Sequence, residues 1–106
     1  MAATGVDGTS IFYSSAVSSI FDGHGAVASV ILDRTALSLD QQGVTGNSLL
    51  MWAAYFGQLA VAQDLLKRGA NTALVNVDGD TAVTLARKQG YFDIVTLLMA
   101  YSGNAR

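Results

Sequence analysis

The sequence predicts an all-α fold, a solenoid of stacked helix-turn-helix units that are joined by hairpin-like loops. The main observation is an internal repeat: Gly46 and Gly79 lie 33 positions apart, as do Gly57 and Gly90. A fixed period of this length is typical of architectures in which each unit buries its apolar face against the next. The composition agrees, because 51% of the residues are hydrophobic and only 13% are charged, so a continuous core can form.

The first unit, residues 9–41, is a degenerate copy of the repeat. A polar cap at Thr9 or Ser10 can start a helix that runs to about Phe21, and the glycines that follow end it. A second helix is expected over residues 26–34. Its apolar stripe at helical spacing consists of Val27, Val30, Ile31 and Leu32.

The second unit, residues 42–74, follows the repeat closely. A polar loop leads into a helix expected over residues 48–56, where the hydroxyl of Ser48 can cap the first turn. A glycine ends that helix. A second helix is expected over residues 60–68, and Gly69 supplies its stop.

The third unit, residues 75–106, has the same order. The dipeptide Asp78-Gly79 favours a turn, and a helix is expected over residues 81–89, where the hydroxyl of Thr81 can cap the first turn. The last helix is expected to run from Asp93 to about residue 101, because an acidic residue suits a helix N-terminus.

Small residues indicate how the units pack. Ala53, Ala54 and Ala86 fall where one helix pair meets the next, and alanine lets the backbones approach closely. Since each unit needs its neighbours to bury its apolar face, residues 1–106 are expected to form a single domain.

These units resemble the ankyrin repeat family, strongly over residues 44–104 and weakly over residues 10–40. The matching motifs of the second unit are Gly46-Asn-Ser-Leu-Leu, Trp52-Ala-Ala-Tyr-Phe-Gly-Gln and Leu65-Leu-x-x-Gly-Ala-Asn. Those of the third unit are Asp78-Gly-Asp-Thr-Ala-Val and Ile94-Val-x-Leu-Leu-Met. The resemblance implies a loop, a short helix, a tight glycine turn and a longer antiparallel helix in each unit.

The resemblance also implies a non-catalytic protein–protein interaction module, an adaptor or an inhibitor, that binds a protein partner through its concave groove and loop tips. On the family's pattern Tyr55 and Phe56 end an inner helix and face that groove. Aromatic side chains are frequent interface anchors, so these two are the first candidates for partner binding. The alternative is that Tyr55 or Phe56 packs under the irregular first unit. The corresponding candidates are Phe21 in the first unit and Lys88 and Gln89 in the third.

The loop tips supply the remaining partner-binding candidates, which are Asn47, Val77, Asp78 and Asp80. Asp78, Asp80 and Lys88 are expected to provide charge complementarity and register. Trp52 lies on the same short helix as Tyr55, but the family's pattern assigns its position to the core.

The last helix supports an alternative hypothesis of self-association. Ala100 and Tyr101 stand where the second unit has Lys67 and Arg68, whereas a terminal repeat normally carries a polar outer face. Either Ala100 and Tyr101 form a homodimer contact, or Tyr101 covers the apolar end of its own chain.

Several positions depart from the family's pattern. Met51 and Thr84 replace a histidine that ties adjacent loops together, so looser loops are expected. Arg87 replaces the second alanine of a pair, and Asp64 stands where leucine is preferred.

No catalytic, cofactor or metal site is predicted. His24 is the single histidine and there is no cysteine, so neither a zinc set nor a Cys–His nucleophile can be assembled. The net charge of −2 argues against nucleic-acid binding, and no apolar run approaches the roughly 20 residues of a membrane span. A cytoplasmic protein is expected, and Met1 favours a complete chain.

Overall fold

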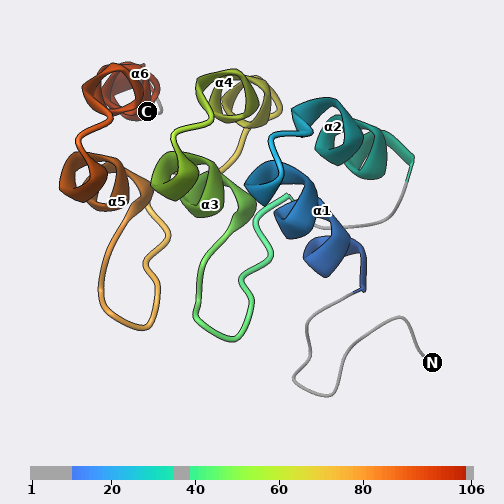
Figure 1. Cartoon of the computed structure of the whole chain (residues 1–106). Coiled ribbons are helices and arrows are strands. Elements are labelled where there is room, and N and C mark those ends of the chain that lie inside the picture. The colour runs from blue at the N-terminus through green and yellow to red at the C-terminus, as the bar shows by residue number, and fades with distance from the viewer. Residues whose placement is uncertain (1–10, 35–38, 105–106) are drawn as a thin grey trace.

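The computed structural model describes residues 11–34 and 39–104, and within them every regular element is a helix (Figure 1). The helices form three antiparallel pairs, one for each predicted unit. In chain order they are α1 (Ile11–Phe21), α2 (Gly25–Arg34), α3 (Leu49–Phe56), α4 (Leu59–Lys67), α5 (Ala82–Gln89) and α6 (Phe92–Asn104).

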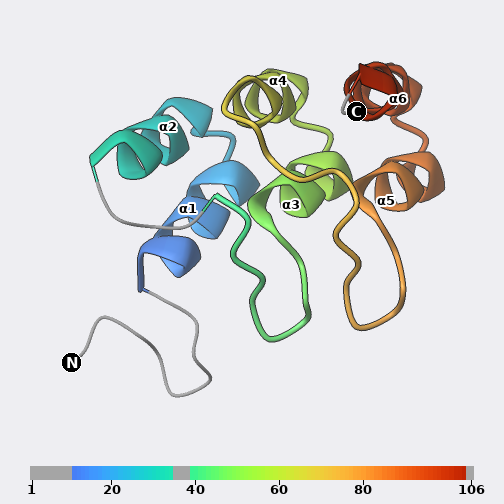
Figure 2. The same cartoon turned by 180° about the vertical axis from the view of Figure 1, so that it is seen from behind.

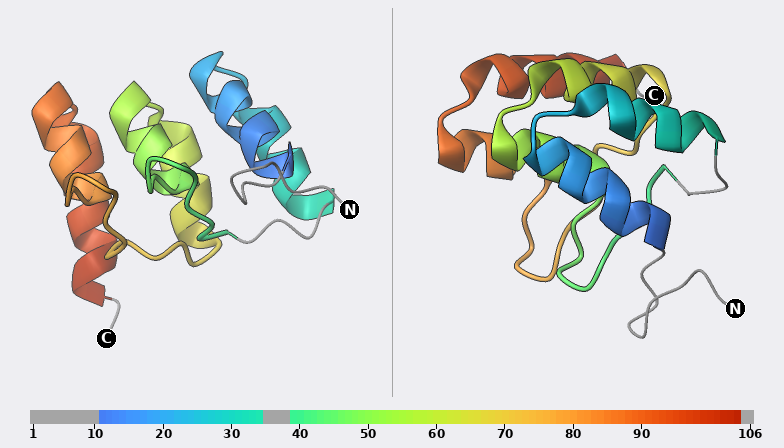
Figure 3. Two further views of the ribbon diagram at one scale, coloured as in Figure 1. Left: turned by 90° about the horizontal axis from the view of Figure 1, so that it is seen from below. Right: turned by 45° about the vertical axis from the view of Figure 1, so that its right-hand side comes forward.

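The helix pairs stack side by side in two layers. An inner layer contains α1, α3 and α5, an outer layer contains α2, α4 and α6, and neighbours within each layer are in contact (Figures 1 and 2). The loops before α3 and α5 extend away from both layers, as Figure 3 shows. The predicted solenoid with hairpin-like loops is therefore confirmed.

The predicted caps define the short inner helices. The hydroxyls of Ser48 and Thr81 accept hydrogen bonds from the third backbone amide of α3 and α5, at 3.3 Å in each case. Gly57 and Gly90 end these helices in the left-handed conformation that glycine adopts without strain. The last helix continues past the predicted end at Tyr101.

The core lies between the two layers and between successive pairs. Ala53, Ala54 and Ala86 are fully buried, as the repeat pattern predicted. They are surrounded by larger apolar side chains that are also buried, among them Ile20, Leu49, Leu50, Leu65, Ile94 and Leu98.

The apolar stripe predicted for α2 is only partly correct. Val27 and Val30 are 49% and 53% exposed, and the fully buried residue of this helix is Ala28. The side of α2 that meets α4 is polar, because Ser29 bonds there to Asp64 of α4 and Asp33 bonds to Arg68, which directly follows α4. The two valines consequently fall on other sides of the helix.

A polar network joins the outer helices of the first two units. Arg68 bonds to Asp33 at 2.7 Å and to Asp64 at 3.1 Å, and the hydroxyl of Ser29 donates to Asp64 at 2.5 Å. The bond to Asp33 is the main cause that raises the pKa of Arg68. Asp64, an unexpected residue at its position in the repeat, is thus the acceptor that connects α2 to α4.

The two described loops are tied together despite the missing histidines. The backbone amide of Val77 donates to the carbonyl of Thr45 at 3.0 Å. The side-chain amide of Gln42 donates to the carbonyls of Gly46 and Val75, at 2.7 Å each. These bonds, which the sequence did not predict, connect the two loops where looser loops were expected.

Tyr13 connects the first unit to the second. Its hydroxyl accepts a hydrogen bond from the indole nitrogen Nε1 of Trp52 at 3.0 Å and donates one to the carbonyl of Asn47. The side chain is only 6% exposed, and burial raises the pKa of its phenol. A bond to Trp52 opposes this rise but is the smaller effect.

The loop contact predicts that Gly46→Ala will destabilise the protein more than Gly79→Ala. Both glycines have a left-handed backbone, with φ of +83° and +81°, so alanine costs about 1–2 kcal/mol at either position. Only at Gly46 would the new Cβ lie 2.8 Å from the backbone of the next loop, at Asn76 and Val77. Urea unfolding should give Gly46→Ala a free energy of unfolding at least about 1 kcal/mol lower than that of Gly79→Ala. Equal losses would contradict the loop contact.

The environment of Tyr13 predicts a loss of stability at high pH. Since its pKa is higher in the folded state than in the unfolded chain, its contribution is complete below about pH 10 and is lost as the pH rises through the folded pKa. Urea unfolding at about pH 8 and about pH 11, followed by circular dichroism, should show a smaller decline for Tyr13→Phe than for wild type. Equal losses of stability in wild type and Tyr13→Phe would refute the assignment of this pH dependence to Tyr13.

Candidate protein-interaction surface

Four aromatic side chains gather on the inner layer where α1 and α3 end. We call Phe21, Trp52, Tyr55 and Phe56 the aromatic cluster. The ring of Phe21 meets Phe56 edge to face at a centroid distance of 5.1 Å, so the cluster spans two units. Within α3, Phe56 stacks on Trp52 at 5.6 Å and meets Tyr55 at 5.2 Å.

The cluster has a buried base and an exposed surface. Trp52 and Phe56 are partly buried and pack against the core, whereas Phe21 is 65% exposed and Tyr55 40%. Because exposed aromatic area that is contiguous across two units is unfavourable in water, this patch is a candidate binding surface. The structure thus brings three predicted site residues together: Phe21, Tyr55 and Phe56.

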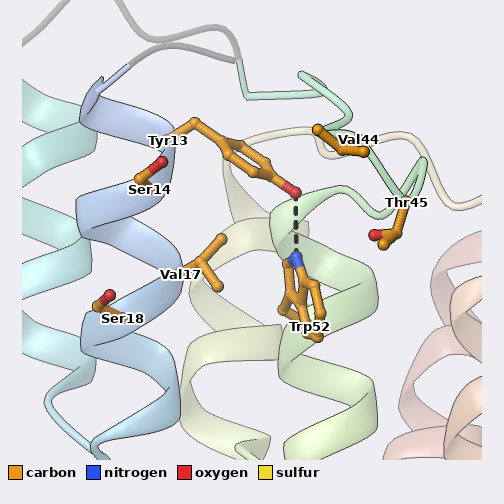
Figure 4. A pocket seen from close by; sticks show the side chains of 7 residues that line it. All are labelled: Tyr13, Ser14, Val17, Ser18, Val44, Thr45 and Trp52. Atoms are coloured by element: carbon orange, nitrogen blue, oxygen red, sulfur yellow. Dashed lines mark hydrogen bonds between the residues drawn. The ribbon is translucent and has the colours of Figure 1, made fainter. Parts of the chain in front are cut away.

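A surface pocket of about 360 Å³ lies beside the aromatic cluster. We call it the α1–α3 pocket (Figure 4). Its lining comes from α1, α3 and the loop before α3, and it consists of Tyr13, Ser14, Val17, Ser18, Val44, Thr45 and Trp52. None of these side chains carries a charge at neutral pH.

Trp52 packs against the core, as the family's pattern implies, but it also belongs to the aromatic cluster and lines the pocket. It packs against the core but stays partly exposed, and its indole bonds to Tyr13. The repeat pattern could not identify this role. It depends on Tyr13 and Val17 of the degenerate first unit, which the sequence placed only approximately.

The predicted charges at the third unit are arranged differently from expectation. The ammonium group of Lys88 pairs with the carboxylate of Asp80 at 3.0 Å, and the Asp80 side chain is only 13% exposed. Both residues were predicted to offer charge to a partner, but they satisfy each other. Asp78 and Gln89 remain exposed.

The loop tips are apolar and partly committed to loop packing. Val77 is 72% exposed, and Val44 is 66% exposed on the neighbouring loop. Asn47, a predicted contact residue, is instead engaged by Asn76, whose amide donates to its side-chain oxygen at 2.9 Å. The two valines are therefore the exposed apolar side chains of these tips.

The two self-association candidates differ from each other. Ala100 is exposed, but Tyr101 is partly buried and packs against the core of its own chain. Of the two readings of Tyr101, the structure supports the intramolecular one. The large exposed side chains of α6 are instead Phe92 at 64% and Met99 at 55%.

His24 lies exposed in the turn between α1 and α2, and no three metal-ligating side chains gather anywhere in the described part of the chain. None of the helices in that part has the length and apolar character that a membrane crossing requires.

Comparison with known proteins identifies the family. The family model for ankyrin repeats in three copies matches residues 12–106. The chain is 39% identical over 82 residues to the ankyrin repeat and KH domain-containing protein mask of Drosophila melanogaster. The matched segment is 76% of this chain and 2% of that protein.

Two further relatives are also similar in sequence to this chain. Ankyrin repeat family A protein 2 of Mus musculus is 43% identical over 54 residues, 51% of this chain and 16% of the relative. The DNA replication inhibitor plutonium of Drosophila melanogaster is 33% identical over 73 residues, 69% of this chain and 42% of the relative. The chain thus matches less than half the length of each relative named here. Since the family model covers nearly all of the described residues, the chain belongs to the ankyrin repeat family.

Proposed function

We propose that this chain binds a protein partner through its inner layer, with the aromatic cluster as the anchor. Ankyrin repeats are generally protein–protein interaction modules, which sets the class of function. The observation that supports this particular surface is the contact of Phe21 with Phe56, because it makes one exposed aromatic patch from two units.

The expected interface is small and rests on a few residues. Aromatic side chains at the centre of an interface contribute most of the binding free energy, and their neighbours mainly exclude water. Three units present limited area, so the interface should lie at the low end of specific sizes, below about 1,200 Å². Affinity would then depend strongly on Phe21 and Tyr55, the exposed members of the cluster.

The proposed mode of action is occupancy without catalysis. An adaptor would hold its partner at this surface, and an inhibitor would cover a surface that the partner needs. One relative is named as an inhibitor of DNA replication, which describes that protein and makes inhibition by occupancy a reasonable form of the proposal here.

The test is affinity capture from a lysate of the source cells, followed by mass spectrometry. The double variant Phe21→Ser/Tyr55→Ser should lose the specific partner by at least about tenfold while remaining folded by circular dichroism. Phe92→Ser is the matched control, because Phe92 is 64% exposed, like Phe21, but lies on the outer helix α6.

Equal capture by wild type and the double variant would refute the aromatic cluster as the anchor. Loss of capture by Phe92→Ser as well would indicate a general effect of removing exposed aromatic area.

One observation favours self-association as a second candidate function. Met99 is 55% exposed, whereas Leu66, which occupies the same repeat position one unit earlier, is only 4% exposed. The α6 face that would be covered by a following unit is therefore apolar and open among the described residues. A second copy of the chain could cover it.

If a second copy covers this face, the molar mass should rise with protein concentration in light scattering. Met99→Lys should then restore the monomer mass, because a charge would be buried without a partner. The exposed residue Ala60, changed to lysine, provides a control on α4. A monomer mass at all concentrations would exclude this candidate.

A further inference from the structure

We propose that the α1–α3 pocket receives one large uncharged side chain, such as leucine, methionine or phenylalanine, from an extended segment of the protein partner. The inference rests on the proposed function, since it assigns part of the partner's chemistry at the same surface. It concerns a site that the aromatic cluster alone does not define, because most of its lining comes from α1 and the loop before α3.

The absence of charged side chains in the pocket indicates which kind of side chain it can bind. All seven lining side chains are uncharged at neutral pH, so a lysine or glutamate placed here would find no ion-pair partner among them. The apolar part of the lining, Val17, Val44 and Trp52, offers favourable contact to an aliphatic or aromatic group. An uncharged apolar side chain is therefore the occupant that this pocket favours.

The volume limits how much of the partner enters. At about 360 Å³ the pocket lies near the lower limit of about 300 Å³ for ligand pockets. It can hold one large side chain, while the rest of the segment lies across the surface.

Hydroxyl groups at the pocket can bind the backbone beside that side chain. Ser14 and Ser18 stand one helical turn apart on α1, and Thr45 lies on the loop (Figure 4). None of these three hydroxyls bonds to another residue in the described segments, whereas the hydroxyl of Ser19 donates to the carbonyl of Ser15 at 2.9 Å. They are available to the amides and carbonyls of an extended segment.

The pocket wall is held in position before binding. Trp52 is fixed on one side by its bond to Tyr13 and on another by stacking on Phe56, with the rings 13° from parallel. A preorganised wall reduces the ordering entropy that binding must overcome. Because Trp52 also belongs to the aromatic cluster, a segment seated in the pocket continues directly onto Phe56 and Tyr55.

The experiment is selection of a random 12-residue peptide library displayed on phage against the folded wild-type chain. We expect the selected peptides to share one large uncharged apolar residue without an enriched charged residue at that position. Ser18→Lys places a charge at the pocket and should weaken their binding at least about tenfold. Ser15→Lys is the matched control, because Ser15 is exposed on the same helix but does not line the pocket.

The readout is fluorescence of Trp52, the only tryptophan of the chain. Peptides that bind wild type and Ser15→Lys with a change in emission, and bind Ser18→Lys at least tenfold more weakly, would support the proposal. Equal binding to all three variants would overturn it, as would enrichment of charged anchors or a failure to select any peptide. A fluorescence change that depends only on the concentration of the chain itself would assign the pocket to a second copy and also overturn it.

The Phe21→Ser/Tyr55→Ser variant separates this proposal from the proposed function. Peptides lost by that variant but retained by Ser18→Lys would leave the aromatic cluster as a binding surface and refute the pocket. Peptides that still bind both variants would count against the aromatic anchor and against the pocket.

Discussion

The structure depends on the close approach of neighbouring helix pairs, which only small side chains permit. Ala16, Ala53 and Ala86 are fully buried, one on each inner helix. A larger side chain at such a contact would overpack it at a cost of about 1–3 kcal/mol. Because the pairs stack this closely, apolar residues on both layers exclude water and corresponding residues of successive units come into contact. The loops, the aromatic cluster and the polar network between α2 and α4 all follow from this spacing.

The proposed binding surface is a consequence of the same stacking. An inner helix standing alone would expose its C-terminal aromatic residues to water. Stacked, α1 and α3 place Phe21 against Phe56, and the combined rings shield one another while still presenting apolar area. The pocket beside them forms because the loop before α3 passes over α1, where the hydroxyl of Tyr13 bonds to the carbonyl of Asn47. Anchor and pocket therefore share the junction between the first two units.

The third unit differs in its surface chemistry, so the two ends of the inner layer present different side chains. Where α3 has Tyr55 and Phe56, α5 has Lys88 and Gln89, and Lys88 is paired with Asp80. This ion pair offers a partner little free charge, because a partner would have to break it or leave it in place. On the inner helices, the exposed aromatic side chains therefore belong to the first two units.

The sequence predicted the helices, their caps and the buried alanines, because these follow from local residue preferences and from the repeat period of 33 positions. It also identified Tyr55, Phe56 and Phe21 as surface candidates, since corresponding positions share one face of the stack. It could not anticipate that Asp80 and Asn47 would be occupied by Lys88 and Asn76, or that Trp52 would line a pocket. Those outcomes depend on side-chain contacts between segments that lie apart in the chain, and such contacts exist only after the units have packed.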